Sequence, residues 1–177
     1  MALWEEDELS VRLGPQFLTQ LYSQASCDPK TLAYVSFVKP NELACWCLGF
    51  TDYLGFNASL KTLDLYCLTL GKLLFGDLRL CQVLDHLFGP PPYRKARVNR
   101  AHLGAFGITS RKFENVMALE KVMAQITEEL SANYHSCWGV TNTTNTGAQM
   151  LMKKVGFVQI DTIELRDRTV LTYEYSS

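Results

Sequence analysis

Hydrophobic positions recur along the chain with two spacings, one typical of strands and the other of helices. Alternating or continuous apolar runs predict strands at Glu8–Leu13, Thr31–Val38, Leu43–Phe50, Val98–Thr109, Ser136–Thr141, Phe157–Leu165 and Thr169–Tyr175. Apolar residues three and four apart predict helices that start at Pro15, span Glu114–Leu130 and follow Asn145. Pro40 and Asn41, between the second and third predicted strands, indicate a hairpin.

The segment Asn57–Phe88 is predicted to add two more helices to this pattern. Its leucines recur with helical spacing, and Gly71 and Gly76 divide it into two predicted helices. Gly89 and the three prolines after it end the segment. The predicted order is β-α-β-β-(αα)-β-α-β-α-β-β, with the apolar pair of helices packed as an extra layer.

The stretch NTGAQMLMKKVGF carries the clearest local signal in the chain. Ala148, Leu151, Met152 and Val155 form one apolar helical face. An Asn lies at the N-terminal cap before this face, and a Gly lies at the C-terminal cap after it. The sequence therefore predicts a short capped helix followed directly by a strand.

Composition narrows the classes of function. A chain of 177 residues is expected to form one domain, 1–177, and its formal charge of −1 does not predict a nucleic-acid surface. There is no uncharged apolar run long enough to span a membrane, and the acidic start MALWEEDELS predicts no secretion signal. None of the six cysteines forms a Cys-x-x-Cys pair. We expect a cytoplasmic protein with free thiols and no metal.

The element order, together with the capped helix and the Gly-Phe that follows it, resembles the GNAT superfamily of acyl-CoA-dependent N-acetyltransferases. The resemblance implies an α/β (α+β) fold with a mixed, mostly antiparallel sheet of about seven strands flanked by helices. It also implies that Gly104–Thr109 of the fourth strand splays apart from the fifth strand, Ser136–Thr141. The helices of 57–88 would then be inserted between the third and fourth strands, beside the acceptor cleft.

The same resemblance locates a site for acetyl-CoA or another acyl-CoA. The pantetheine arm would pair with the exposed edge of the fourth strand, and the pyrophosphate would lie at the start of the next helix, where backbone amides bind anions. The residues that this implies for binding the co-substrate are Phe106, Gly107, Ile108, Arg111, Lys112, Asn115 and Asn145.

Two departures from the family pattern weaken the match. The usual pyrophosphate turn reads Arg/Gln-x-x-Gly-x-Gly/Ala, whereas this chain reads SRKFENVMA and has no glycine there. Arg111 and Lys112 either compensate with charge or are solvated residues of a helix start. Many members also have a tyrosine, thought to protonate the leaving thiolate, where this chain has Met152, which cannot donate a proton.

No catalytic base follows from the sequence. His102, Asp52 and Tyr53 are candidates, as is one of Tyr173 and Glu174, which alternate faces of the last strand. The first hypothesis is an N-acyltransferase that acts on an unidentified amine of a small molecule or peptide. The alternative is a non-catalytic GNAT-like module that binds a partner or CoA without turnover. A homodimer remains open.

Overall fold

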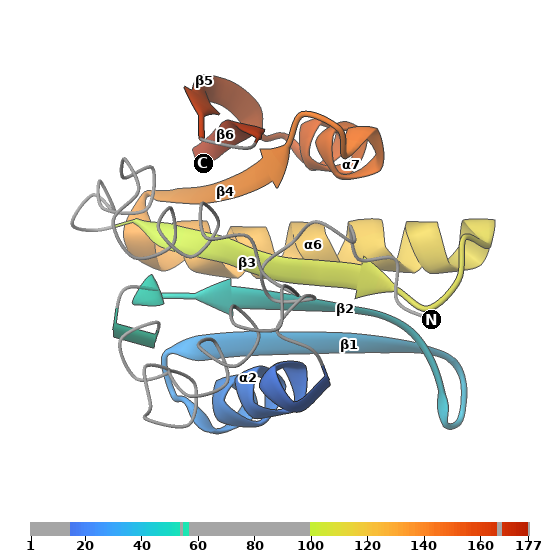
Figure 1. Ribbon diagram of the computed structural model, residues 1–177. Helices are drawn as coiled ribbons and strands as arrows, with labels where there is room; N and C mark the ends of the chain where they lie inside the picture. Colours follow the sequence, from blue (N-terminus) through green and yellow to red (C-terminus); the bar gives the residue numbers. More distant parts are fainter. Residues whose placement is uncertain (1–14, 54, 57–99, 166–167, 177) are drawn as a thin grey trace, which may run out of the picture.

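The computed structural model describes residues 15–53, 55–56, 100–165 and 168–176 (Figure 1). Its helices and strands are α2 (Pro15–Cys27), β1 (Thr31–Lys39), β2 (Glu42–Phe50), β3 (Ala101–Ile108), α6 (Phe113–Tyr134), β4 (Ser136–Asn142), α7 (Thr146–Val155), β5 (Val158–Glu164) and β6 (Thr169–Ser176). The predicted strand Glu8–Leu13 and the apolar segment Asn57–Phe88 lie outside the described residues.

The described strands form one six-stranded sheet in the order β1-β2-β3-β4-β6-β5 (Figure 1). β3 and β4 are parallel, and every other neighbouring pair is antiparallel. The predicted mixed, mostly antiparallel sheet is therefore confirmed. The described residues supply six of the about seven strands expected, and the strand predicted at 8–13 lies outside them.

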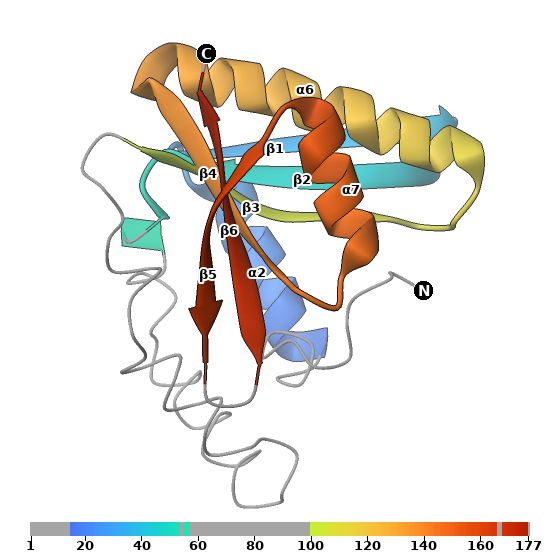
Figure 2. The ribbon, with the colours of Figure 1, turned by 90° about the horizontal axis from the view of Figure 1, so that it is seen from above.

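Helices cover both faces of the sheet, with α6 along one face and α2 along the other (Figures 1 and 2). The alternation of β2 explains this arrangement, because Cys45 and Cys47 belong to the core under α6 while Leu48 and Phe50 pack on the α2 side. α6 presents a stripe of buried apolar residues to the sheet: Leu119, Val122, Met123, Ile126 and Leu130.

The parallel pairing of β3 with β4 is short. It joins only Ala101 to Cys137, His102 to Trp138 and Leu103 to Gly139, after which both strands continue unpaired with each other. The predicted splay, which begins at Gly104, is confirmed.

A bulge in β3 coincides with the start of the splay. Cys47 of β2 pairs with Phe106 and Gly49 pairs with Leu103, so two residues of β3, Gly104 and Ala105, lie opposite one residue of β2. An extra residue of this kind bends the strand that carries it. The bend accounts for the departure of β3 from β4.

α7 ends as its sequence predicts. The side-chain oxygen of Asn145 accepts a hydrogen bond of 3.0 Å from the Ala148 amide, which caps the first turn. Gly156 has φ of 107°, and the Phe157 amide donates to the Met152 carbonyl at 3.0 Å. The left-handed glycine turns the chain directly into β5.

Replacing this glycine tests the cap. Gly156→Ala places a side chain in a left-handed conformation, so we expect it to lower the free energy of unfolding by about 1 kcal/mol or more. Gly147 lies inside α7, where an added Cβ would be 3.9 Å from its nearest neighbour, Oδ1 of Asn145. Gly147→Ala is the control and should stabilise the protein by about 0.5–1 kcal/mol. Urea denaturation of both variants measures this; equal effects would contradict the assignment of the cap.

Candidate functional site

The gap between β3 and β4 opens toward the starts of two helices. Because the two strands are parallel, their carboxyl ends lie at the same edge of the sheet, and each strand is followed by a helix. The chain passes from β3 into α6 and from β4 into α7. The amino-terminal ends of α6 and α7 therefore flank the open end of the splay, where backbone N–H groups favour negative charge.

A polar latch fixes the turn between β3 and α6. Thr109 anchors it to β2, because its amide donates to the Ala44 carbonyl at 3.0 Å and its hydroxyl donates to the Leu43 carbonyl at 2.7 Å. The Asn115 side-chain amide then donates to Oγ1 of Thr109 at 3.2 Å and to Oγ of Ser110 at 2.9 Å. Asn115 is buried, so its side chain shapes the turn from beneath.

The predicted charges lie on the outside of the same turn. Arg111 and Lys112 are exposed, and Lys112 is the N-cap of α6 without any side-chain hydrogen bond to the helix start. The Asn115 and Val116 amides donate to the Lys112 carbonyl at 3.1 Å and 3.2 Å, and the amides before them have no carbonyl partner within the helix, as in any helix start. Two cations beside the start of a helix are the chemistry expected of an anion site, although Glu114 adds one negative charge to the first turn.

The remaining binding candidates lie along the unpaired part of β3 and at the start of α7. Phe106 and Ile108 turn toward the core under α6. Gly107 lies under the Trp46 ring, where an added Cβ would be 2.4 Å from a ring carbon. The splay thus brings Phe106, Gly107, Ile108, Arg111 and Lys112 to one border, while Asn145 caps the helix on the other border.

Met152 lies at the closed end of the splay. Its terminal methyl would be 2.6 Å from a Cβ built on Gly139, the last residue of β4 that pairs with β3. Met152 is almost completely buried. The position at which the resemblance would imply a tyrosine is therefore filled by an apolar thioether, packed directly under the strand.

His102 is enclosed by aromatic rings on the opposite face. Its ring centroid is 4.2 Å from that of Tyr53 and 4.4 Å from that of Trp138. Burial lowers the pKa of His102 to about 3, partly offset by a hydrogen bond with the backbone of Trp138. The imidazole is neutral at physiological pH and is a weak base.

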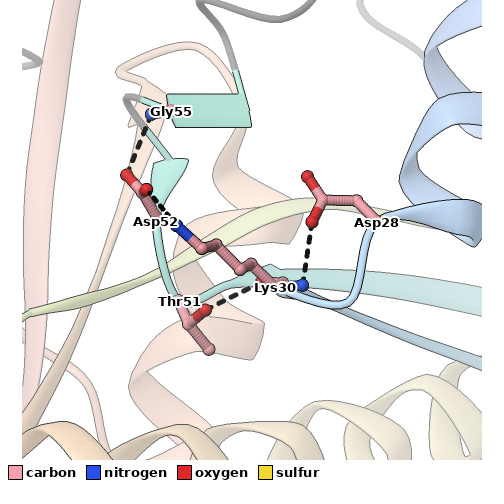
Figure 3. Close-up of polar contacts among 5 residues, drawn as sticks. All are labelled: Asp28, Lys30, Thr51, Asp52 and Gly55. Carbon is pink, nitrogen blue, oxygen red and sulfur yellow. Dashed lines mark hydrogen bonds and ion pairs between the residues drawn. The ribbon is translucent and has the colours of Figure 1, made fainter.

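Asp52 belongs to an exposed clasp at the end of β2 (Figure 3). Its carboxylate accepts from Nζ of Lys30 and from the Gly55 amide, both at 2.9 Å. The Thr51 amide and hydroxyl donate to the Lys30 carbonyl at 2.9 Å and 3.0 Å. The hydrogen bond from Lys30 lowers the pKa of Asp52, so this carboxylate is ionised and capped. It holds the helical turn that carries Tyr53.

Glu174 is also paired. Its Oε1 lies 2.9 Å from Nη2 of Arg100, and both side chains are mostly buried. Arg100 precedes β3 and Glu174 lies on β6, so this ion pair spans β4 at the closed end of the splay. Neither Asp52 nor Glu174 is a free carboxylate, and the catalytic base stays unassigned.

The latch residues Thr109 and Ser110 were not among the site residues expected from the sequence. Their signal is a Thr-Ser pair that directly follows a strand and precedes a helix, a common composition for a turn whose hydroxyls bond to the backbone. In the described part of the chain, no group of three or more metal-ligating side chains could hold a metal ion. No helix in that part is both long and apolar enough to cross a membrane.

No protein-family model and no curated protein matches the sequence. A crystal structure of an acetyltransferase aligns at 17% identity with a TM-score of 0.54, covering 97% of this chain and 84% of that one. An N-acetyltransferase from Staphylococcus aureus Mu50 aligns at 17% identity with a TM-score of 0.51, covering 82% and 69%. A Bacillus anthracis protein in complex with acetyl coenzyme A aligns at 12% identity with a TM-score of 0.52, covering 85% of this chain and 64% of that one.

The chain has the GNAT fold. Within this fold, β3 and β4 are the strands expected to splay, and the start of α6 is the expected pyrophosphate turn. The GNAT fold thus confirms the architecture predicted from the element order. The identities to these structures are low, so the likeness concerns the fold.

Buried His102 should make stability depend on pH. Its folded-state pKa of about 3 lies below the ordinary value of 6.5, so the unfolded chain binds the proton first as pH falls. The free energy of unfolding therefore falls as the pH drops below about 6.5, by up to about 1.4 kcal/mol per pH unit from this histidine. We expect His102→Phe to flatten the slope of unfolding free energy against pH between about pH 6.5 and 4.

The exposed His135 provides the control, because it lies on the surface after α6 with φ of 58°. His135→Asn keeps a residue that tolerates this conformation and should leave the slope as in the wild type. Urea denaturation across the pH range measures all three proteins. A slope unaffected by His102→Phe would contradict a neutral, buried imidazole.

Proposed function

We propose that the protein is an acyl-CoA-dependent N-acyltransferase, with acetyl-CoA as its co-substrate. The observation that carries the proposal is the unpaired edge of β3 from Gly104 to Ile108, which runs directly into the uncapped start of α6. An extended pantetheine arm can hydrogen-bond to such an edge as an additional strand would. The negatively charged pyrophosphate then reaches the amides of α6 and the side chains of Arg111 and Lys112.

The chemistry is a direct transfer. A neutral amine attacks the thioester carbonyl, and backbone amides of β3 stabilise the negative charge that develops on the carbonyl oxygen. The tetrahedral intermediate then collapses, the carbon–sulfur bond breaks, and CoA leaves as a thiolate. The bound acetyl coenzyme A in the Bacillus anthracis neighbour supports this choice of co-substrate.

The candidate residues divide by role in this proposal. Phe106, Gly107 and Ile108 supply backbone along the arm, while Arg111 and Lys112 supply charge. Asn115 and Asn145 act through the turns that they shape. The side-chain amide of Asn115 already donates to Thr109, and the side-chain oxygen of Asn145 already accepts from the Ala148 amide. The acceptor is an amine of a small molecule or peptide.

A non-catalytic module that binds CoA or a partner is the second candidate. Met152 favours it, because a buried thioether at the closed end of the splay cannot protonate a leaving thiolate. The larger side chains at the start of α6 favour it as well, because Val116 and Glu114 occupy a turn where relatives have small residues.

We also propose a single domain over residues 1–177 in the cytoplasm. The support for this compartment is chemical: Cys45, Cys47 and Cys137 are buried, unpaired thiols, which a reducing environment preserves. A homodimer is left to be tested by sedimentation.

Binding and turnover together test the proposal. Isothermal titration with acetyl-CoA, longer acyl-CoAs and CoA should give saturable binding, and release of free thiol in the presence of a panel of primary amines should report transfer. Binding without transfer to any amine would favour the non-catalytic module. The absence of binding to every CoA compound would contradict the enzyme and favour a non-catalytic module that binds a different partner.

The charges of the turn give a quantitative prediction. Because no glycine opens the backbone at the start of α6, Arg111→Ala combined with Lys112→Ala should weaken CoA binding roughly tenfold or more, the effect of losing a charge-assisted contact of about 1.5–3 kcal/mol. The control is Lys121→Ala with Lys153→Ala, which removes two exposed lysines beyond the first turns of α6 and α7. Titration calorimetry measures the CoA affinity of both double variants. Equal affinities would mean that the backbone amides of α6 bind the pyrophosphate without help from Arg111 and Lys112.

A further inference from the structure

Tyr173 lies next to the closed end of the splay. It is the direct partner of Gly139 across the antiparallel pair of β4 and β6. Directly opposed residues in such a pair place their side chains on the same face of the sheet. The Met152 methyl packs on that face of Gly139, and Met152 and Tyr173 belong to the same buried cluster. The phenol and the thioether therefore lie on the same face of the sheet, in the buried cluster beneath the point where β3 and β4 part.

The hydroxyl of Tyr173 is unsatisfied. The side chain is completely buried, and within the described structure its oxygen has no hydrogen-bond partner. Buried polar groups are nearly always bonded, and an unbonded one destabilises the fold. Burial also raises the pKa of Tyr173, which keeps the phenol protonated and able to donate.

Other buried side-chain atoms of the described residues also lack partners, and two that lie on strands next to the splay face the other side of the sheet. Nδ1 of His102 and Oγ1 of Thr172 are unbonded. His102 pairs with Trp138 and Thr172 with Val140, positions that alternate with Gly139 along β4. On the side of Met152, Oγ1 of Thr127 in α6 and the hydroxyl of Tyr173 are both unbonded, and Tyr173 is the one that pairs directly with Gly139 at the closed end of the splay.

We infer that Tyr173 is a catalytic residue that donates a hydrogen bond to the sulfur of CoA as the carbon–sulfur bond breaks. This inference rests on the proposed function. The electron pair of the broken bond goes to sulfur, and the phenol stabilises that thiolate while keeping its own proton. The proton lost by the attacking amine leaves to solvent, from which CoA is finally protonated. Tyr173 thus supplies the donor that Met152 lacks.

The test uses binding alone, so it does not require the acceptor. CoA and desulfo-CoA, in which hydrogen replaces the thiol, are titrated against the protein from about pH 7 to 9.5, across the ionisation of a thiol near pH 8.5. In the wild type, the affinity for CoA relative to desulfo-CoA should hold or rise as the thiol ionises. In Tyr173→Phe the ratio should fall with pH, ending about tenfold below the wild type, the effect of one charge-assisted hydrogen bond.

Tyr175→Phe is the matched control. Tyr175 lies on the same strand and the same face, where its ring packs against Phe157 at 5.6 Å between centroids. This variant should keep the wild-type ratio at every pH. Tyr173→Phe should also unfold at an equal or higher temperature, because it removes an unbonded buried hydroxyl.

The outcomes separate the inference from the proposed function. Wild-type protein that binds neither compound overturns both. Binding of both compounds with the same ratio in Tyr173→Phe as in the wild type overturns the inference and leaves the proposed function standing. A ratio that falls with pH in the wild type itself also overturns the inference, and this readout needs no variant to fold.

Discussion

The parallel pairing of β3 with β4 stops after three residue pairs, and the candidate site depends on where it stops. At the closed end, the strands are held together by that pairing and by the ion pair between Arg100 and Glu174, which spans β4. Beyond it, the bulge at Gly104 and Ala105 bends β3 away. The packing of Phe50 against Gly104 explains why the bulge contains a glycine, since an added Cβ there would be 2.1 Å from the Phe50 ring.

We propose that the open end of the splay binds an anion through backbone amides and charge, in place of the usual glycines. The latch of Thr109, Ser110 and Asn115 fixes the path of the chain into α6. The helix start then presents its free amides next to Arg111 and Lys112. The two positive charges attract an anion over a distance, and the direction of the backbone N–H groups determines where the anion binds. A turn without glycine is thus compatible with an anion site, provided that the charges make up for the crowded amides.

Local signals predicted the local features well. Asn145 and Gly156 cap α7 as their residue types require, and Pro40 and Asn41 connect β1 to β2. The splay was predicted because the resemblance covers nearly the whole element order. Features that depend on several distant segments were not predicted. The need for a glycine at the bulge follows from a phenylalanine on the neighbouring strand, and the inward turn of Asn115 follows from the polar groups of the loop before it.

The unbonded hydroxyl of Tyr173 could not be predicted from the sequence either, because it depends on the register of three strands and the packing of α7. Sequence alternation placed Tyr173 and Glu174 on opposite faces but could not say that Glu174 is paired with Arg100. The departures at Met152 and at the glycine-free turn were visible in the sequence. Their structural consequence, an apolar closed end beside a buried phenol, was not.

The central claim is that the unpaired edge of β3 binds the pantetheine arm of an acyl-CoA. Amide hydrogen exchange with and without saturating acetyl-CoA tests it most directly, because the edge amides of residues 104–108 gain partners only if the arm lies along them. The account predicts slower exchange at residues 104–108 and at the first turn of α6, with no change in β1. Protection confined to other segments, or unchanged exchange along β3 at saturation, would contradict it.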